Sequence, residues 1–227
     1  MQRVRVKICG LREPMQALKI AQMGADAIGM VFASSPRWVS PEQARAITDV
    51  LPPLVTAVGV FVDADPVLIS RVVERAGLHM VQLAGDEPPD IVDALPVPVI
   101  KGFRVRGPDW FEEVYAWLDG VRMHRRLAAV LLDAYDPQAR GGTGRQFNWE
   151  WVADAHAAGK TAALPPLILA GGLDAENVSR AIDLVQPWAV DVSSSVESAP
   201  GVKDIRKVER FIRATREGDE LRSSFWL

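Results

Sequence analysis

Lys7 and Cys9 stand two residues apart in the apolar run VRVKIC (residues 4–9), and Cys9 is the only cysteine of the chain. Alternate side chains of a strand point to the same side, about 7 Å apart. A buried lysine requires an anionic neighbour, for which we consider Asp133, Asp191 or a substrate anion. An ammonium group beside a thiol favours the thiolate. Cys9 is therefore a candidate for chemistry, and a small buried apolar cysteine is the ordinary alternative.

Asp133 ends the apolar run AAVLLD, residues 128–133, where an aspartate is out of character for a buried strand. No helix is predicted to begin directly after it, so a capping role explains it poorly. A glycine-containing loop follows instead, and we expect it to act as a lid. The glycines of this loop are Gly141, Gly142 and Gly144.

Two later segments have the pattern of a phosphate site. LILAGGLDAENV runs from an apolar run through two glycines into a helix start, and AVDVSSSVES runs into small hydroxyl residues. Backbone amides at such turns bind phosphate. The expected donors are the amides of Gly171, Gly172, Ser194 and Ser195, with ordinary turn chemistry as the alternative.

The elements that must position these residues form a regular series. Eight short apolar runs recur along the chain, each followed by a gap long enough for a crossover helix. Ser40-Pro41 and Asp65-Pro66 open two predicted helices as caps, and Gly77 ends the second. The pattern predicts an α/β fold, a single-domain (β/α)8 TIM barrel, whose active site lies at the carboxyl ends of the strands. An open doubly wound sheet is the alternative, although no G-x-G-x-x-G follows the first run.

We expect residues 1–216 to form the catalytic barrel and residues 217–227 to form a C-terminal tail, with Phe225 and Trp226 packing back or meeting a partner. The net charge of -3 gives no basic field for nucleic acid, and no apolar run approaches the ~20 residues of a membrane span. One cysteine excludes an internal disulfide framework, so we expect a cytoplasmic protein with a small-molecule partner.

A metal site is not expected. The three histidines, His79, His124 and His156, lie before a strand or in helical stretches rather than at strand ends. They form no cluster with carboxylates in the predicted barrel, so the sequence predicts neither a metal nor another cofactor.

The motifs VKICGL, GADAIGMVF, SPRWVSPEQA, VGVFV, VQLAGDE, LLDAYDPQARGGTGRQFNW, LAGGLDAENV and AVDVSSSVESAPGVKD occur in this order between Val6 and about Phe211. Together they resemble the phosphoribosylanthranilate isomerase family, the barrel enzymes of tryptophan biosynthesis. The resemblance implies an Amadori rearrangement without a cofactor, in which N-(5'-phosphoribosyl)anthranilate becomes 1-(2-carboxyphenylamino)-1-deoxyribulose 5-phosphate.

The resemblance also implies residue roles. The family's general base falls on Cys9, its general acid on Asp133, and the arginine that faces the anthranilate carboxylate on Arg37. One catalytic group must start protonated and the other ionised. We expect the apolar interior to raise the carboxyl pKa of Asp133 and Lys7 to favour the thiolate of Cys9. The candidate substrate-binding residues are Lys7, Arg37, Gln82, Gly171, Gly172, Asp191, Ser193, Ser194 and Ser195.

The chain departs from the family pattern at two positions. Ala84 replaces a histidine often present at the mouth, and Ser195 occupies a glycine position, where a positive φ would strain a serine. A metal-dependent pentose-phosphate epimerase is disfavoured, because the histidines that would bind its metal are not found at the predicted strand ends. An indole-glycerol-phosphate synthase is disfavoured because it would leave Cys9 unexplained. A catalytically silent sugar-phosphate-binding barrel is the remaining alternative, and either a monomer or a homodimer is compatible with the sequence.

Overall fold

The computed structural model describes residues 3–134 and 146–224. In this part of the chain eight parallel strands close a barrel in sequence order, each hydrogen-bonded to the next and the eighth to the first. The strands are β1 Arg5–Cys9, β2 Ala27–Val31, β3 Thr56–Phe61, β4 Met80–Leu83, β5 Val99–Val105, β6 Leu127–Ala134, β7 Leu167–Leu169 and β8 Ala189–Val192. The predicted (β/α)8 barrel is confirmed, and the open sheet is excluded.

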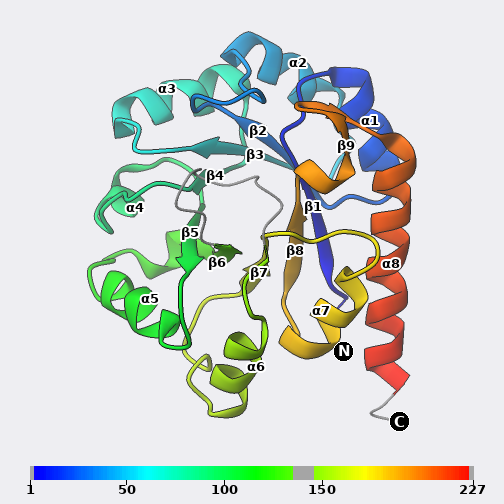
Figure 1. The fold of residues 1–227 in the computed structure, drawn as a ribbon. Coiled ribbons are helices and arrows are strands. Elements are labelled where there is room, and N and C mark those ends of the chain that lie inside the picture. The colour runs from blue at the N-terminus through cyan, green and yellow to red at the C-terminus, as the bar shows by residue number, and fades with distance from the viewer. Residues whose placement is uncertain (1–2, 135–145, 225–227) are drawn as a thin grey trace.

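Helices surround the strands as an outer ring (Figure 1). They are α1 Pro14–Gln22, α2 Pro41–Val50, α3 Pro66–Ala76, α4 Ile91–Ala94, α5 Trp110–Leu118, α6 Glu150–Ala157, α7 Val178–Val185 and α8 Ile205–Ser224, with 3-10 turns η1 His124–Arg126 and η2 Ser194–Val196. The predicted caps are confirmed: Ser40 forms a capping box, Asp65 caps α3 and Gly77 ends α3 in the left-handed region.

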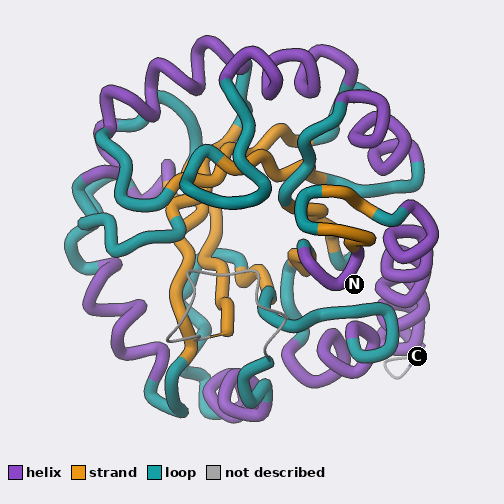
Figure 2. The backbone as a smooth tube through the Cα atoms, turned by 45° about the horizontal axis from the view of Figure 1, so that its top comes forward, coloured by secondary structure: helices purple, strands orange, loops and turns teal. Residues whose placement is uncertain are grey.

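A small antiparallel hairpin follows η2, made of β9 Glu197–Ala199 and β10 Val202–Lys203. It was not predicted from the sequence. The hairpin lies outside the barrel strands, near α1 and α8, as the tube view also shows (Figures 1 and 2). Hydrogen bonds between the Gln16 side chain and the Lys203 backbone attach it to α1.

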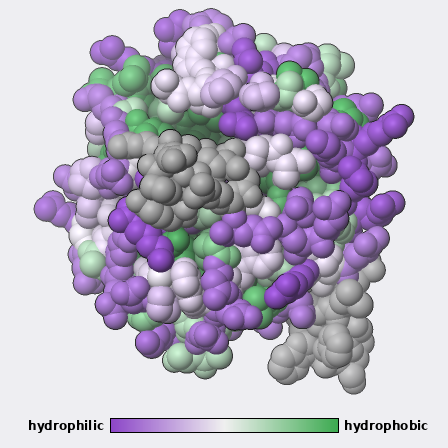
Figure 3. All heavy atoms as spheres, in the orientation of Figure 1, coloured by the Kyte–Doolittle hydropathy of each residue, from purple (hydrophilic) through white to green (hydrophobic). Residues whose placement is uncertain are grey.

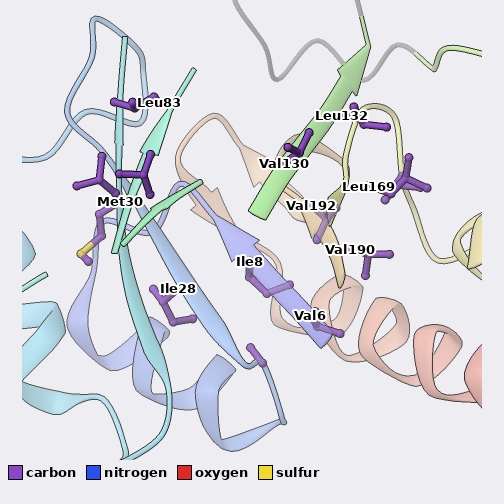
Figure 4. Close-up of a cluster of buried hydrophobic side chains, with 14 of the residues drawn as sticks. Val6, Ile8, Ile28, Met30, Leu83, Val130, Leu132, Leu169, Val190 and Val192 are labelled. Atoms are coloured by element: carbon purple, nitrogen blue, oxygen red, sulfur yellow. The ribbon is translucent and has the colours of Figure 1, made fainter. Parts of the chain in front are cut away.

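Two apolar layers stabilise the barrel. The outward side chains of the strands pack against the helices, as Val6 and Ile8 do on β1 (Figure 4). A smaller cluster fills the barrel interior and consists of Val58, Ile100, Ala129, Leu131, Ile168, Ala170 and Ala189. This arrangement confirms that Val6 and Ile8 face the helices while Lys7 and Cys9 face inward, because alternate residues of a strand point to opposite sides.

Helix α8 continues beyond Arg216, so part of the segment predicted as a tail is helical, and Phe225 and Trp226 lie outside the described residues. In the space-filling view hydrophilic residues dominate the surface over the helices, and hydrophobic residues gather in a hollow beside the centre (Figure 3). Among the described helices, none combines the length and apolar character needed to cross a membrane.

Candidate active site

A cavity of about 720 Å³ opens at the carboxyl ends of the strands. The predicted site residues in its lining are Cys9, Arg37, Gln82, Asp133, Gly171, Gly172, Asp191, Ser193, Ser194 and Ser195. Lys7 lies one layer deeper on β1, as the two-residue spacing predicts. Barrel closure thus brings together residues that are as much as 186 positions apart in sequence, from Cys9 to Ser195.

Cys9 is the last residue of β1 and is only 8% exposed. The neighbouring β2 residue is Gly29, and a Cβ atom there would lie 2.7 Å from the Cys9 Sγ. Burial raises the pKa of the Cys9 thiol, and the cations of Lys7 and Lys203 offset this only in part. Lys7 thus favours the thiolate, as expected, but the cost of burying the anion is larger than the attraction of the cation, and the net shift of the Cys9 pKa is upward.

Lys7 pairs with Asp191, its register neighbour on β8, with 2.9 Å between the Lys7 Nζ and the Asp191 Oδ1. Both side chains are almost entirely buried. Burial by itself lowers the pKa of Lys7, but the charges of Asp191 and Cys9 outweigh it and the pKa rises. The anionic neighbour predicted for Lys7 is therefore Asp191, and Lys7 remains a cation.

Asp133 lies near the end of β6, next to Arg104 in the strand register. Its Oδ1 accepts a hydrogen bond from the Ala134 backbone amide at 2.8 Å. Burial raises the pKa of Asp133 to about 6, against the lowering effects of that hydrogen bond and of Arg104 and Lys7. The predicted direction of the shift is confirmed, and Asp133 can carry a proton close to neutral pH.

Arg37 reaches the cavity from the loop before α2 and is held by Glu197 of β9 through two hydrogen bonds. Gly10 makes room for it, since a Cβ atom at Gly10 would lie 2.6 Å from the Arg37 Cδ. The hydrogen bonds to Glu197 raise the pKa of Arg37 despite partial burial. The guanidinium is thus a fixed positive charge at the cavity wall.

The two segments predicted to bind phosphate lie side by side in the cavity lining. Gly171 and Gly172 have φ angles of +84° and +65°, which only glycine adopts readily. The Ser195 hydroxyl donates a hydrogen bond to the Leu173 carbonyl and so joins the two segments. Ser195 is not among the residues with positive φ, so the condition under which a serine would be strained at this position is not met.

Gln82 of β4 is 6% exposed, and its Oε1 has no hydrogen-bond partner among the described residues. A buried amide oxygen without a partner is costly, which makes Gln82 a candidate acceptor for a ligand. Gln82 also borders a second cavity of about 210 Å³, which shares Ala84 and Asp133 with the first. Ala84, at the position where family members often have a histidine, lines both cavities together with Asp133.

Four charged residues that support the site were not predicted from the sequence. Glu87 and Lys101 form a buried ion pair at 2.7 Å that fixes the loop after β4. Glu197 and Lys203 form another at 2.7 Å beside Arg37. A signal for the second pair exists in the sequence, because Pro200-Gly201 is typical of a turn and places Glu197 opposite Lys203 in a hairpin.

The predicted lid glycines, Gly141, Gly142 and Gly144, lie outside the described residues. Of the histidines, His79 accepts a hydrogen bond from the Ala57 amide and His156 lies 2.8 Å from the Thr161 hydroxyl. Within residues 3–134 and 146–224, no group of three or more His, Cys, Asp and Glu side chains is arranged to hold a metal ion.

Comparison with known proteins gives a consistent result. Residues 6–214 match the family model described as N-(5'phosphoribosyl)anthranilate (PRA) isomerase. The N-(5'-phosphoribosyl)anthranilate isomerase of Geobacter sulfurreducens is 50% identical over 214 residues, which cover 94% of this chain and 98% of that protein.

Solved structures agree with these sequence matches. One is a phosphoribosyl anthranilate isomerase in complex with reduced 1-(o-carboxyphenylamino)-1-deoxyribulose 5-phosphate, with a TM-score of 0.80 and 37% identity. Another contains monomers generated from the dimeric enzyme of Thermotoga maritima, with a TM-score of 0.80 and 36% identity. Each match covers 94% of this chain and 99% of the other.

Proposed function

The chain belongs to the N-(5'-phosphoribosyl)anthranilate isomerase family, and we propose that Cys9 is the general base and Asp133 the general acid of its reaction. The protein is an aldose-ketose isomerase of tryptophan biosynthesis. It converts N-(5'-phosphoribosyl)anthranilate to 1-(2-carboxyphenylamino)-1-deoxyribulose 5-phosphate by an Amadori rearrangement. The observation that carries the proposed roles is that Cys9 and Asp133 line one cavity from different strands, with Arg37 and the Gly171 and Ser194 turns in the same wall.

In the proposed mechanism Asp133 donates a proton to the ribose ring oxygen, which opens the ring to a Schiff base. Cys9 then removes the proton from C2', and the enolamine that results tautomerises to the ketone. The chemistry requires one proton on the pair at the start, held by Asp133. The raised pKa of Asp133, about 6, brings this carboxyl near the range in which an acid of this kind works at neutral pH.

The resting protein and the reactive form contain the same number of protons. The raised pKa of Cys9 and the value of about 6 for Asp133 leave the single proton on the thiol at neutral pH. Transfer of this proton from the Cys9 thiol to the Asp133 carboxylate gives the reactive form, and no proton is exchanged with solvent. The two groups share this proton and titrate as a pair, so the reactive form is a minor state of the same macroscopic species.

The substrate has an anion at each end, and the cavity offers a complement to both. We assign the anthranilate carboxylate to Arg37, whose planar guanidinium matches a carboxylate in two hydrogen bonds. We assign the phosphate to the turns at Gly171, Gly172, Ser194 and Ser195, in the position where this fold binds phosphate. Gln82, with its free amide oxygen, is the proposed acceptor for a hydroxyl or amine hydrogen of the sugar.

Ser193 and Asp191 complete the proposed binding surface. The Ser193 hydroxyl donates to the Cys9 carbonyl at 3.0 Å and so fixes the end of β1. Asp191 keeps Lys7 in place beneath Cys9, at 2.9 Å. We infer that Lys7 acts on the substrate mainly through Cys9, because Lys7 lies below the cavity floor, whereas Asp191 itself lines the cavity.

We further propose that the catalytic unit is residues 1–216, since the family match ends at residue 214. A reduced thiol at Cys9 is needed for catalysis, and a reducing compartment such as the cytoplasm maintains it. We infer a free-standing monomer or homodimer; the Thermotoga maritima relative is described as dimeric, with monomers generated from it.

The test of the function uses the fluorescence of the anthranilate group. The purified protein is mixed with phosphoribosylanthranilate that is formed in situ, and the loss of fluorescence is followed. Conversion with saturation kinetics is the expected result. A protein that binds the reduced product analogue but does not convert the substrate would contradict the proposal and would favour the silent barrel.

A further inference from the structure

Three charged side chains are packed together at the edge of the active site. Only 14% of the Arg37 side chain is exposed, 5% of Glu197 and 0% of Lys203. Burying charges is costly, and an ionic cluster at this depth is weak evidence for a role in stability alone. Such a cluster therefore calls for a functional explanation.

The Glu197 carboxylate binds both cations. Its Oε1 accepts hydrogen bonds from the Arg37 Nε at 2.8 Å and from the Lys203 Nζ at 2.7 Å, and its Oε2 accepts from the Arg37 Nη2 at 2.7 Å. This geometry occupies one edge of the guanidinium, which has five N–H groups in all. Among the described residues no other hydrogen bond of the guanidinium is found, so hydrogens on its other edge are available to a ligand in the main cavity, which Arg37 lines.

Lys203 links this cluster to the other end of the site. Its Nζ donates to the Ser193 carbonyl at 2.9 Å and lies 3.4 Å from the Ser193 hydroxyl. Ser193 directly precedes Ser194 and Ser195 at the proposed phosphate turn. The backbone of Lys203 is in turn fixed by the Gln16 side chain, through hydrogen bonds of 3.0 and 3.1 Å.

We propose that Glu197 and Lys203 are positioning residues that hold Arg37 in the orientation that recognises the substrate carboxylate, and that they couple this orientation to the Ser193–Ser195 turn. The proposal rests on the proposed function, in which Arg37 binds that carboxylate. A free arginine would lose its side-chain freedom when the ligand binds, whereas an arginine held by Glu197 has already lost it.

The net charge of the cluster supports the same role. Two cations and one carboxylate leave one positive charge at the wall of the cavity, which attracts an anion. The hydrogen bonds from Arg37 and Lys203 outweigh burial and lower the pKa of Glu197, so its carboxylate stays ionised and keeps both contacts. Replacing this carboxylate with a neutral amide weakens the hold on Arg37 and raises the charge of the cluster by one. A lower carboxylate preference in such a variant therefore reports the orientation of Arg37, because the change in charge alone would increase the preference.

The test compares two ligands by calorimetry: the reduced product analogue, and the same compound without its carboxylate. The wild-type protein is expected to bind the first more tightly. Glu197→Gln is expected to reduce this preference about tenfold, while the affinity for the carboxylate-free ligand stays within about twofold. In turnover the KM of Glu197→Gln should rise more than its kcat falls.

Further variants keep the test decisive. The double variant Glu197→Gln/Lys203→Met removes the Lys203 cation as well, so Arg37 is the one charge left in the cluster instead of two adjacent cations. It therefore serves if the single variant fails to fold, and it should show the same loss of preference. Ser198→Ala is the matched control, because Ser198 is an exposed residue of the same hairpin and its hydroxyl donates a hydrogen bond to the Val202 carbonyl, away from Arg37. Its ligand preference should be unchanged.

Arg37→Ala separates the premise from the inference. If Arg37→Ala keeps the carboxylate preference, the role of Arg37 fails and the inference fails with it. If Arg37→Ala loses the preference while folded Glu197→Gln keeps it, only the inference is overturned. Equal weakening of both ligands by folded Glu197→Gln would also overturn it, since that result indicates a general structural role.

Discussion

At the scale of single residues, the proposed mechanism depends on where one proton resides. Burial raises the pKa of both Cys9 and Asp133, so the pair holds a single proton over the neutral range. The residue types and their places at strand ends were predictable from the sequence. The direction of the Cys9 shift was not, because it depends on how completely the thiol is enclosed, which no local pattern encodes.

The first prediction concerns the pH dependence of kcat/KM. As the pH falls below about 6, the pair binds a second proton, Cys9 and Asp133 are both neutral and the base is lost. We expect kcat/KM to decrease about tenfold per pH unit well below this value. The Kd of the product analogue over the same range is the control, because a phosphate monoester itself titrates near pH 6. A flat profile between pH 7 and 5 would contradict the assignment.

The second prediction concerns the stability cost of Asp133. Its pKa is about 6 in the folded protein against 3.8 as the ordinary value, so above pH 6 the folded state bears the cost of a buried anion. Asp133→Asn removes this cost and should raise the free energy of unfolding by at most ~3 kcal/mol at pH 7.5. The gain should shrink between pH 6 and 3.8, because in this range the carboxyl of the folded wild-type protein is protonated while that of the unfolded chain is still ionised.

Urea denaturation at pH 7.5 and pH 4.5 measures this difference. Asp119→Asn, at an exposed position after α5, provides the control for a simple loss of charge. A destabilised Asp133→Asn at pH 7.5 would show that the carboxylate makes a net favourable contribution to stability, which is the opposite of the expected cost.

At the scale of elements, glycines set how closely the loops approach the proposed catalytic groups. A Cβ atom at Gly171 would lie 2.5 Å from the Ala134 amide nitrogen and 2.9 Å from the Asp133 Oδ1, and its φ is +84°. Gly159 has a φ of +71° but no atom within 4 Å of such a Cβ. Both glycines have a positive φ, which would strain any other residue, but they differ in their surroundings.

The third prediction compares alanine substitutions at Gly159 and Gly171. Gly159→Ala should lose ~1 kcal/mol of stability from backbone strain alone and should keep its activity. Gly171→Ala should lose more stability and at least about tenfold in kcat, since the new methyl group displaces Asp133. Thermal melts and steady-state kinetics check both variants. Equal effects of the two substitutions would mean that the approach of Gly171 to Asp133 is unimportant.

The sequence predicted the regular elements well and the irregular ones poorly. Apolar runs identified the barrel strands, and Ser40 and Asp65 identified helix starts, because both signals are local. The β9–β10 hairpin was missed because its strands have only three and two residues and no apolar alternation. The absence of strain at Ser195 could not be foreseen either, since φ at that turn follows from the 3-10 geometry of η2.

At the scale of the whole molecule, the closed barrel makes neighbours of residues from opposite ends of the chain. Lys7 meets Asp191, and Arg37 meets Glu197, across the junction where β8 pairs with β1. The count of apolar runs predicted the barrel, but partner choice across this junction depends on tertiary packing. From the sequence, Asp191 was therefore only one of several possible partners for Lys7, and the structure identifies it.

The fourth prediction follows from this architecture. A ligand that contacts the turns after β7 and β8 and the loop before α2 binds only the closed barrel. At 100 times its Kd, the reduced product analogue should raise the free energy of unfolding by ~2.7 kcal/mol. The melting temperature should rise by about 5–10 °C for a chain of this size. No shift at 100 times the Kd would contradict the premise that the ligand binds only the folded barrel.

The most direct test of the central claim is the turnover of Cys9→Ala compared with wild type, followed by the loss of anthranilate fluorescence. Calorimetry with the reduced product analogue confirms that the variant still folds and binds. We predict that kcat falls by a factor of ~10²–10⁴ while the Kd changes little. A Cys9→Ala protein that turns over at the wild-type rate would contradict the assignment of Cys9 as the base.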